Sequence, residues 1–151
     1  MSSKIEHASF TLTRAFKATP ERVYQAHTQE AAKRRWFVEG EGFDTYEYSI
    51  DARIGGREIW RGAHRGGPEI TNNTYYLDLV ENRRIIVAYE MTIGGKRISA
   101  SLATIEIEAT DSGSTLTFTE QGAYLDGLDK VENREHGTRE LLEALAKDLE
   151  A

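Results

Sequence analysis

The sequence predicts an α+β domain in which one antiparallel sheet wraps a single long helix. Three patterns support this class: a strand followed by a strong helix start near the N-terminus, a long β region in the middle, and an amphipathic helical stripe near the C-terminus. The chain has 151 residues, close to the roughly 150 residues of one average domain. We therefore treat residues 1–151 as a single domain.

The first part of the chain predicts one strand followed by two short helices. Residues 8–16 alternate in polarity as a half-buried strand does. Thr19 is a favourable N-cap, and Pro20 suits the first position of a helix. Thr28 predicts a second N-cap, which would open another short helix containing Trp36.

From residue 43 to residue 122 the pattern is that of successive β-strands. The Gly55-Gly56 pair predicts a turn with unusual backbone angles, and Gly94-Gly95 predicts a two-residue hairpin turn. After a strand that contains Tyr46, Tyr48 and Ile50, we expect strands near 57–63, 70–80, 84–93, 96–109 and 114–121.

The C-terminal segment predicts one long helix. Asp129 and Glu132 have the spacing of a capping box. His136 projects away from the apolar stripe. Gly137 costs the helix roughly 1 kcal/mol relative to Ala, so we expect it to allow a close approach to the sheet. The inward stripe consists of Val131, Arg134, Thr138, Leu141, Leu142, Leu145 and Leu149.

The order and spacing of several motifs resemble a known family. The motifs are Arg14-x-Phe16-x-Ala18-x-Pro20-Glu21-x-Val23-Tyr24, Trp36-Phe37, Ile54-Gly55-Gly56, Leu77-Asp78-Leu79-Val80, Arg83-Arg84-Ile85-Ile86, Gly113-Ser114-Thr115-Leu116-Thr117-Phe118, Glu120 to Gly127, and His136-Gly137. Together they resemble the single-domain proteins homologous to the C-terminal domain of the ATPase activator of the ninety-kilodalton heat-shock protein. That family belongs to the START-related, birch-pollen-allergen-like (SRPBCC) superfamily, and the resemblance extends from about residue 8 to residue 149.

The resemblance implies a helix-grip fold, in which a curved antiparallel sheet surrounds the C-terminal helix and leaves a cavity between them. In this superfamily the cavity commonly binds lipids, polyketides or other apolar small molecules, and some members are cyclases or hydrolases. The eukaryotic co-chaperone has an additional N-terminal domain that stimulates the chaperone's ATPase. We expect no room for that domain in this chain, so co-chaperone activity does not follow from the resemblance.

A polar pair is expected inside such a cavity. By period two, Glu120 shares a strand face with Leu116 and Phe118 and would point toward the cavity. Arg134 lies on the inward stripe of the helix, so the two side chains should meet. Two interpretations stay open: an anchor for a polar ligand group, or a solvated or structural ion pair without a binding role.

The remaining cavity candidates are mainly aromatic. Trp60 shares a strand face with Glu58, and Tyr89 shares one with Ile85 and Val87. Ile59 and Trp60 are adjacent and only one of them can face inward, so the sequence leaves open which face of the strand near 57–63 does so. Filling of the core is the alternative role for each aromatic side chain. The full set of expected cavity residues is Trp36, Glu58, Trp60, Tyr89, Phe118, Glu120, Arg134 and Thr138.

Composition and spacing argue against several other classes. The net charge of −6 disfavours a nucleic-acid or anionic-membrane surface, and no apolar run is long enough to span a membrane. There is no cysteine, and the four histidines lack zinc-ligand spacing. The N-terminus has no apolar signal-peptide run, which favours the cytoplasm. Arg53, Arg57, Arg61 and Arg65 recur every four residues, and we expect a solvated face there.

The sequence therefore predicts the binding of a small, largely apolar, lipid- or polyketide-like molecule in an internal cavity, without cofactor or metal. One alternative is an enzyme that uses Glu120 as a general base, which would need a raised carboxyl pKa. The other is a chaperone-interacting or stress-related module that acts through its outer surface. The identity of the ligand and the oligomeric state stay open.

Overall fold

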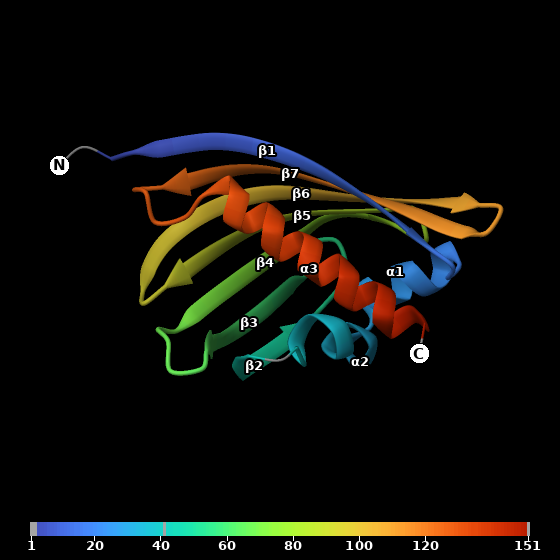
Figure 1. The fold of residues 1–151 in the computed structure, drawn as a ribbon, viewed down its shortest axis with the longest axis horizontal. Helices are drawn as coiled ribbons and strands as arrows, with labels where there is room; N and C mark the ends of the chain where they lie inside the picture. The colour runs from blue at the N-terminus through green and yellow to red at the C-terminus, as the bar shows by residue number, and fades with distance from the viewer. Residues whose placement is uncertain (1–2, 41, 151) are drawn as a thin grey trace.

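A single curved antiparallel sheet surrounds the C-terminal helix (Figure 1). The computed structural model describes residues 3–40 and 42–150. Within these residues seven strands lie in the order β1-β7-β6-β5-β4-β3-β2, and every neighbouring pair is antiparallel. They are β1 (Ile5–Phe16), β2 (Phe43–Ile50), β3 (Arg57–His64), β4 (Ile70–Val80), β5 (Arg84–Ile93), β6 (Lys96–Thr110) and β7 (Gly113–Leu125).

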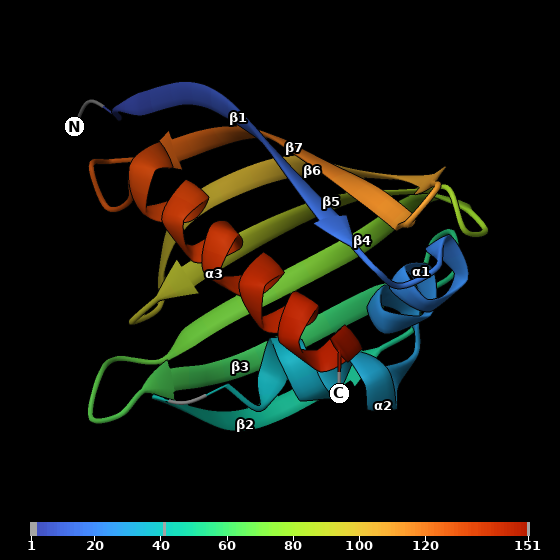
Figure 2. The same cartoon turned by 45° about the vertical axis from the view of Figure 1, so that its right-hand side comes forward.

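Four helical segments complete the fold of the described residues. Three short ones, α1 (Pro20–Thr28), α2 (Glu30–Lys33) and the π-helical turn η1 (Arg34–Val38), connect β1 to β2. The long helix α3 (Val131–Glu150) crosses the concave side of the sheet, and its C-terminal end lies near the short helices (Figure 2). The expected α+β helix-grip architecture is confirmed, although β1 begins before residue 8 and β7 continues beyond residue 121.

The turns form where the glycine pairs predict them. Gly94 and Gly95 have φ angles of 58° and 79°, which the hairpin between β5 and β6 requires. Gly55 has a φ of 86°, and a Cβ on Gly56 would lie 1.9 Å from the carbonyl oxygen of Asp51. Only glycine fits that turn without movement of the backbone.

The short helices differ from the prediction in one cap. The Thr19 hydroxyl accepts a hydrogen bond from the Arg22 amide at 3.3 Å, as expected of an N-cap. Thr28 is not the second cap: it ends α1, and its hydroxyl donates to the carbonyl of Tyr24 at 3.0 Å. Gln29 is the residue before α2, and its side chain makes no cap hydrogen bond.

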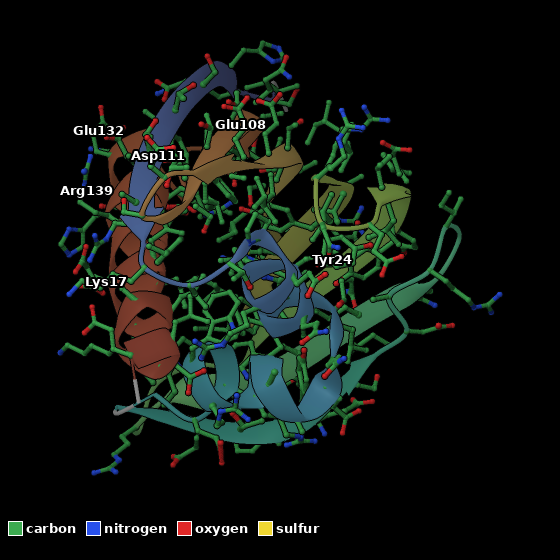
Figure 3. All side chains as sticks on the ribbon, turned by 90° about the vertical axis from the view of Figure 1, so that its right-hand side faces the viewer. Lys17, Tyr24, Glu108, Asp111, Glu132 and Arg139 are labelled. Atoms are coloured by element: carbon green, nitrogen blue, oxygen red, sulfur yellow. The ribbon has the colours of Figure 1, made fainter. Side chains whose placement is uncertain are left out.

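The core lies between α3 and the strands. The buried leucines of α3, Leu142, Leu145 and Leu149, pack against Phe10, Leu12, Phe16, Ile85, Ile105, Ile107 and Leu116. On the opposite side of α3, Glu132 and Arg139 project away from the sheet (Figure 3). His136 also lies on this outer side, with 73% of its side chain exposed. The predicted amphipathic stripe of α3 is therefore confirmed.

Ion pairs and hydrogen bonds hold the C-terminal half of α3. Arg35 of η1 lies 2.9 Å from the carboxylate of Asp148, and Arg22 of α1 donates to the carbonyl of Leu149 at 3.0 Å. Arg14 of β1 lies 2.9 Å from Glu143. These contacts fix that half of α3 against β1 and the short helices.

Two expectations for the start of α3 are wrong. Gly137 does not approach the sheet closely, because a Cβ built on it would meet no atom within 4 Å. Asp129 and Glu132 form no capping box among the described residues. The Asp129 carboxylate instead accepts from the Lys130 amide at 2.8 Å and from Arg134 at 2.6 Å.

The arginines of β3 lie on the convex side of the sheet. The guanidinium of Arg57 stacks on Tyr75 at 5.1 Å, and that of Arg61 stacks on Tyr46 at 5.5 Å. The expectation of strands with a solvated basic face is confirmed here.

Within the described residues, no helix is both long and apolar enough to cross a membrane.

Candidate functional site: a cavity between the sheet and the long helix

A cavity of about 570 Å³ lies between the concave face of the sheet and α3. Most of its wall is apolar, including Ile85, Val87, Ile98, Ile105, Phe118 and Leu141. Polar side chains enter it from α1 and α2, from β3 to β5, and from the first half of α3. An apolar wall with a few polar groups is the usual composition of a small-molecule site.

Strand register explains which polar groups face the cavity. Glu58 of β3 pairs with Thr74 of β4, Thr74 pairs with Tyr89 of β5, and Tyr89 pairs with Ser101 of β6. Directly paired residues in antiparallel strands point to the same side of a sheet. One polar row therefore crosses the concave face from β3 to β6.

The first polar cluster joins Arg134 of α3 to the sheet. Its Nη1 lies 3.4 Å from Oε2 of Glu120 and donates to the Tyr89 hydroxyl at 2.9 Å. Its Nη2 donates to Ser99 at 2.8 Å and to Asp129 at 2.6 Å. The guanidinium is thus bonded on both of its terminal nitrogens.

Glu120 is enclosed within this cluster. Its exposed fraction is 0%, and the Tyr89 hydroxyl donates to its Oε1 at 2.7 Å. Burial raises the pKa of the Glu120 carboxyl above its usual value, while the Tyr89 hydrogen bond and the Arg134 charge oppose the rise. Burial and the nearby Glu120 also raise the pKa of Tyr89.

Tyr124 lies behind the same cluster with an unbonded hydroxyl. Its ring is buried, and its hydroxyl has no partner within the part of the chain that the structure describes. The ring lies over Gly122, where a Cβ would be 3.0 Å from it, and the guanidinium of Arg134 lies 5.5 Å from its centre. Burial raises the pKa of Tyr124 to about 12. The tyrosine therefore stays protonated and packs against the charged arginine.

A second buried carboxylate, Glu58, lies near the short helices. Lys33 of α2 contacts its Oε1 at 2.7 Å, and the Tyr76 hydroxyl donates to the same oxygen at 2.6 Å. The Tyr48 hydroxyl donates to Oε2 at 3.0 Å. Burial, followed by the charge of Glu58, raises the pKa of both tyrosines. This cluster ties the helical connection to β2, β3 and β4.

His27 and Trp36 form the wall beside the Glu58 cluster. Nδ1 of His27 lies 2.8 Å from the carbonyl oxygen of Val23, and the Trp36 ring meets the imidazole edge-on at a centroid distance of 5.0 Å. Trp36 donates to the carbonyl of Ala26 at 2.8 Å. Burial lowers the pKa of His27 to about 4, and the imidazole is therefore neutral near pH 7.

The structure brings most of the expected residues to one cavity. Trp36, Glu58, Trp60, Tyr89, Phe118, Arg134 and Thr138 all line it. Glu120 does not line it, although it lies on the expected strand face and meets Arg134 as predicted. Its oxygens are turned to Arg134 and Tyr89, so Glu120 supports the wall from behind.

Sequence reasoning missed His27 and Lys33 in the wall, and Tyr48 and Tyr76 as partners of Glu58. His27 follows Val23 and Ala26 at helical spacing, so the apolar stripe of α1 was a usable signal for its burial. Lys33 carries no such signal, because its helix has only four residues. Within residues 3–40 and 42–150, no group of three or more acidic or histidine side chains is placed to hold a metal ion.

Comparisons with known proteins agree with this fold. A structure from Rhizobium leguminosarum is 39% identical, with a TM-score of 0.95 and 99% of each chain covered. A Rhizobium loti protein is 43% identical, with a TM-score of 0.90, covering 96% of this chain and 99% of its own. A Chromobacterium violaceum protein is 27% identical, with a TM-score of 0.80, covering 95% and 97%.

None of the curated proteins compared with the chain matches it. The family model described as "Activator of Hsp90 ATPase homolog 1-like protein" matches residues 17–150, which include the short helices, β2 to β7 and α3. The chain therefore belongs to this family, and its fold is that of the SRPBCC proteins.

Proposed function

We propose that this protein binds a small, largely apolar molecule in the cavity between its sheet and α3. The observation that carries the proposal is the cavity itself, about 570 Å³ in volume and walled mainly by aliphatic and aromatic side chains. Sites for small molecules commonly have volumes of about 300–1,000 Å³. The cavity is thus large enough for a lipid- or polyketide-like ligand.

The two buried carboxylate clusters support the proposal by stabilising the cavity wall. Glu58 and Glu120 each have tyrosine donors and a cationic partner in place. Buried polar groups that are fully bonded hold one geometry and do not need a ligand to neutralise them. An apolar molecule can therefore enter without leaving either carboxylate unpaired.

The enzyme alternative receives less support at Glu120. The raised pKa of Glu120 meets one requirement of a general base. However, the carboxylate is fully buried and does not line the cavity, so a bound substrate would not reach it. A base must lie within hydrogen-bond distance of the proton that it removes.

Gly137 offers a direct test of the cavity. It lines the cavity and has open space where a side chain would begin. We expect Gly137→Phe to fill part of the cavity and weaken the binding of the methyl ether of β-naphthol at least tenfold, measured by fluorescence titration. His136→Phe places the same ring on the exposed side of α3 and should leave the affinity unchanged.

Equal affinity in the wild type and Gly137→Phe would contradict the proposal, as would no binding to the wild type. Native mass spectrometry of protein purified from its own host is a second test. A bound small molecule that is lost on denaturation would support the proposal and give the mass of the ligand.

A further inference from the structure

One nitrogen of the His27 ring has no hydrogen-bond partner among the described residues, and His27 lines the cavity. The residue is 5% exposed and belongs to the cavity wall. Nδ1 lies 2.8 Å from the carbonyl oxygen of Val23, and since a carbonyl only accepts, Nδ1 must carry the ring proton. Nε2 is then an unprotonated acceptor with a free lone pair.

Neighbouring contacts hold the ring in this orientation. The Trp36 ring meets it edge-on, with an interplanar angle of 64°. Trp36 is itself fixed by its hydrogen bond to Ala26, one residue before His27 in α1. A rotation that turned Nε2 toward Val23 would break the Nδ1 hydrogen bond. The acceptor therefore has a defined direction.

The charged groups near the ring are already engaged with each other. Lys33 and Glu58 line the same cavity as His27, and their side chains are 2.7 Å apart. Glu58 accepts further bonds from Tyr48 and Tyr76. No group in the described parts of the chain donates to Nε2. Nε2 is not among the enclosed side-chain atoms that lack a partner, which leaves it within reach of a donor group on a molecule in the cavity.

The protonation state of the ring fits the role of an acceptor. Burial lowers the pKa of His27 to about 4, the Lys33 charge lowers it as well, and the Val23 hydrogen bond and the Glu58 charge oppose the change. The imidazole is thus neutral at neutral pH.

We propose that Nε2 of His27 accepts a hydrogen bond from a hydroxyl or N–H group of the bound ligand. The cavity then selects apolar molecules that carry one such donor, such as phenols, alcohols and cyclic amides, over hydrocarbons, ethers and esters of the same size. This inference rests on the proposed function, because it assumes that a ligand occupies the cavity. It assigns to His27 a positioning role for that ligand.

A matched pair of probes tests the assignment. β-Naphthol carries the donor, and its methyl ether has the same ring system without it. We expect the wild type to bind β-naphthol about tenfold more tightly than the ether, as one net hydrogen bond would give. In His27→Phe this ratio should fall to about one while the affinity for the ether stays similar. His136→Phe, on the outer side of α3, should keep the ratio of the wild type.

Nitrogen NMR of the wild-type protein provides a test that needs no change at position 27. The Nε2 resonance of His27 should have the position of an unprotonated ring nitrogen and should move on addition of β-naphthol but not of the ether. A protonated Nε2, or an unmoved resonance in the β-naphthol complex, would overturn the assignment even if His27→Phe does not fold.

The outcomes separate this inference from the proposed function. Equal affinity of the wild type for both probes would overturn the role of His27 and leave cavity binding standing. Binding of neither probe would overturn both proposals. A tenfold preference that persists in a folded His27→Phe variant would show that another group meets the donor, and the assignment would again be wrong.

Discussion

The guanidinium of Arg134 lies 3.4 Å from the carboxylate of Glu120, and the side chains of the two residues are 10% and 0% exposed. This contact joins α3 to β7 by a buried charge pair. Asp129 also forms an ion pair with the guanidinium of Arg134. The Tyr89 hydroxyl accepts a hydrogen bond from Arg134 and donates one to Glu120. Both charged groups of the pair have partners. Removal of one side chain would leave a buried unpaired charge, so it should lower the free energy of unfolding more than removal of both side chains.

Removal of Arg134 tests this pair. We expect Arg134→Met to lower the free energy of unfolding near pH 7 by about 3–5 kcal/mol, because it leaves a buried unpaired carboxylate. The double variant Glu120→Gln/Arg134→Met should recover part of the loss in urea unfolding. Arg139→Met, which breaks an exposed pair with Glu135, should cost no more than about 1 kcal/mol. A similar loss in both single variants would contradict the structural role.

The loss in Arg134→Met should also depend on pH. The pKa of Glu120 is already raised above 4.5 by burial, and removal of the cation raises it further. The ionised carboxylate opposes folding, so its penalty is complete above the folded-state pKa and fades as the pH falls through that value toward 4.5. The difference between wild type and variant should therefore be smaller near pH 5 than near pH 7. A difference in unfolding free energy between the wild type and Arg134→Met that does not change with pH would contradict this prediction.

His27 should make stability fall on acidification. Its pKa is lowered from 6.5 to about 4, so the unfolded chain takes up the proton first as the pH falls. The contribution is complete above 6.5 and is lost between 6.5 and about 4, amounting to about 3 kcal/mol. We expect His27→Phe to have a shallower dependence of unfolding free energy on pH over this window, and His136→Phe to keep the wild-type dependence. Parallel curves for the wild type and His27→Phe would contradict the burial of a neutral imidazole.

Adjacent tyrosines on β4 provide a matched pair for the Glu58 cluster. The Tyr76 hydroxyl donates to buried Glu58 at 2.6 Å, whereas Tyr75 is 40% exposed on the other side of the sheet. We expect Tyr76→Phe to lower the free energy of unfolding by about 1.5–3 kcal/mol and Tyr75→Phe to change it by less than about 0.5 kcal/mol. Chemical denaturation of both variants would measure this, and equal effects would count against the hydrogen bond.

Two glycines should respond in opposite directions to alanine. Gly137 lies within α3 with open space at its Cβ position, so Gly137→Ala should stabilise the protein by about 1 kcal/mol. Gly56→Ala would place a Cβ 1.9 Å from the Asp51 carbonyl and should destabilise it by about 1–3 kcal/mol. The midpoints of thermal unfolding of the two variants and the wild type would measure these changes in stability. A loss of stability in Gly137→Ala would mean that the helix is packed more closely there than the structure indicates.

Sequence periodicity was sufficient to predict which face of a strand or helix a residue lies on, because that face depends only on the geometry of the element itself. The period-two alternation of β7 placed Leu116, Phe118 and Glu120 on the concave side, and the helical projection of α3 placed Arg134 toward them. Their meeting follows from these two local patterns and the helix-grip arrangement. By contrast, the cap at Thr28 and the close approach at Gly137 depend on how neighbouring segments pack, and both predictions were wrong.

The sequence by itself determined the order of the elements, the inward stripes of β7 and α3, and the glycine turns, because each depends on interactions between residues near one another in the chain. Only the tertiary structure decided that Glu58 would meet Lys33, Tyr48 and Tyr76, since these residues come from separate elements. It also decided that Glu120 lies behind the cavity wall and His27 within it. The reason is physical: sheet curvature and strand register set which buried polar groups are covered by neighbours and which face open space.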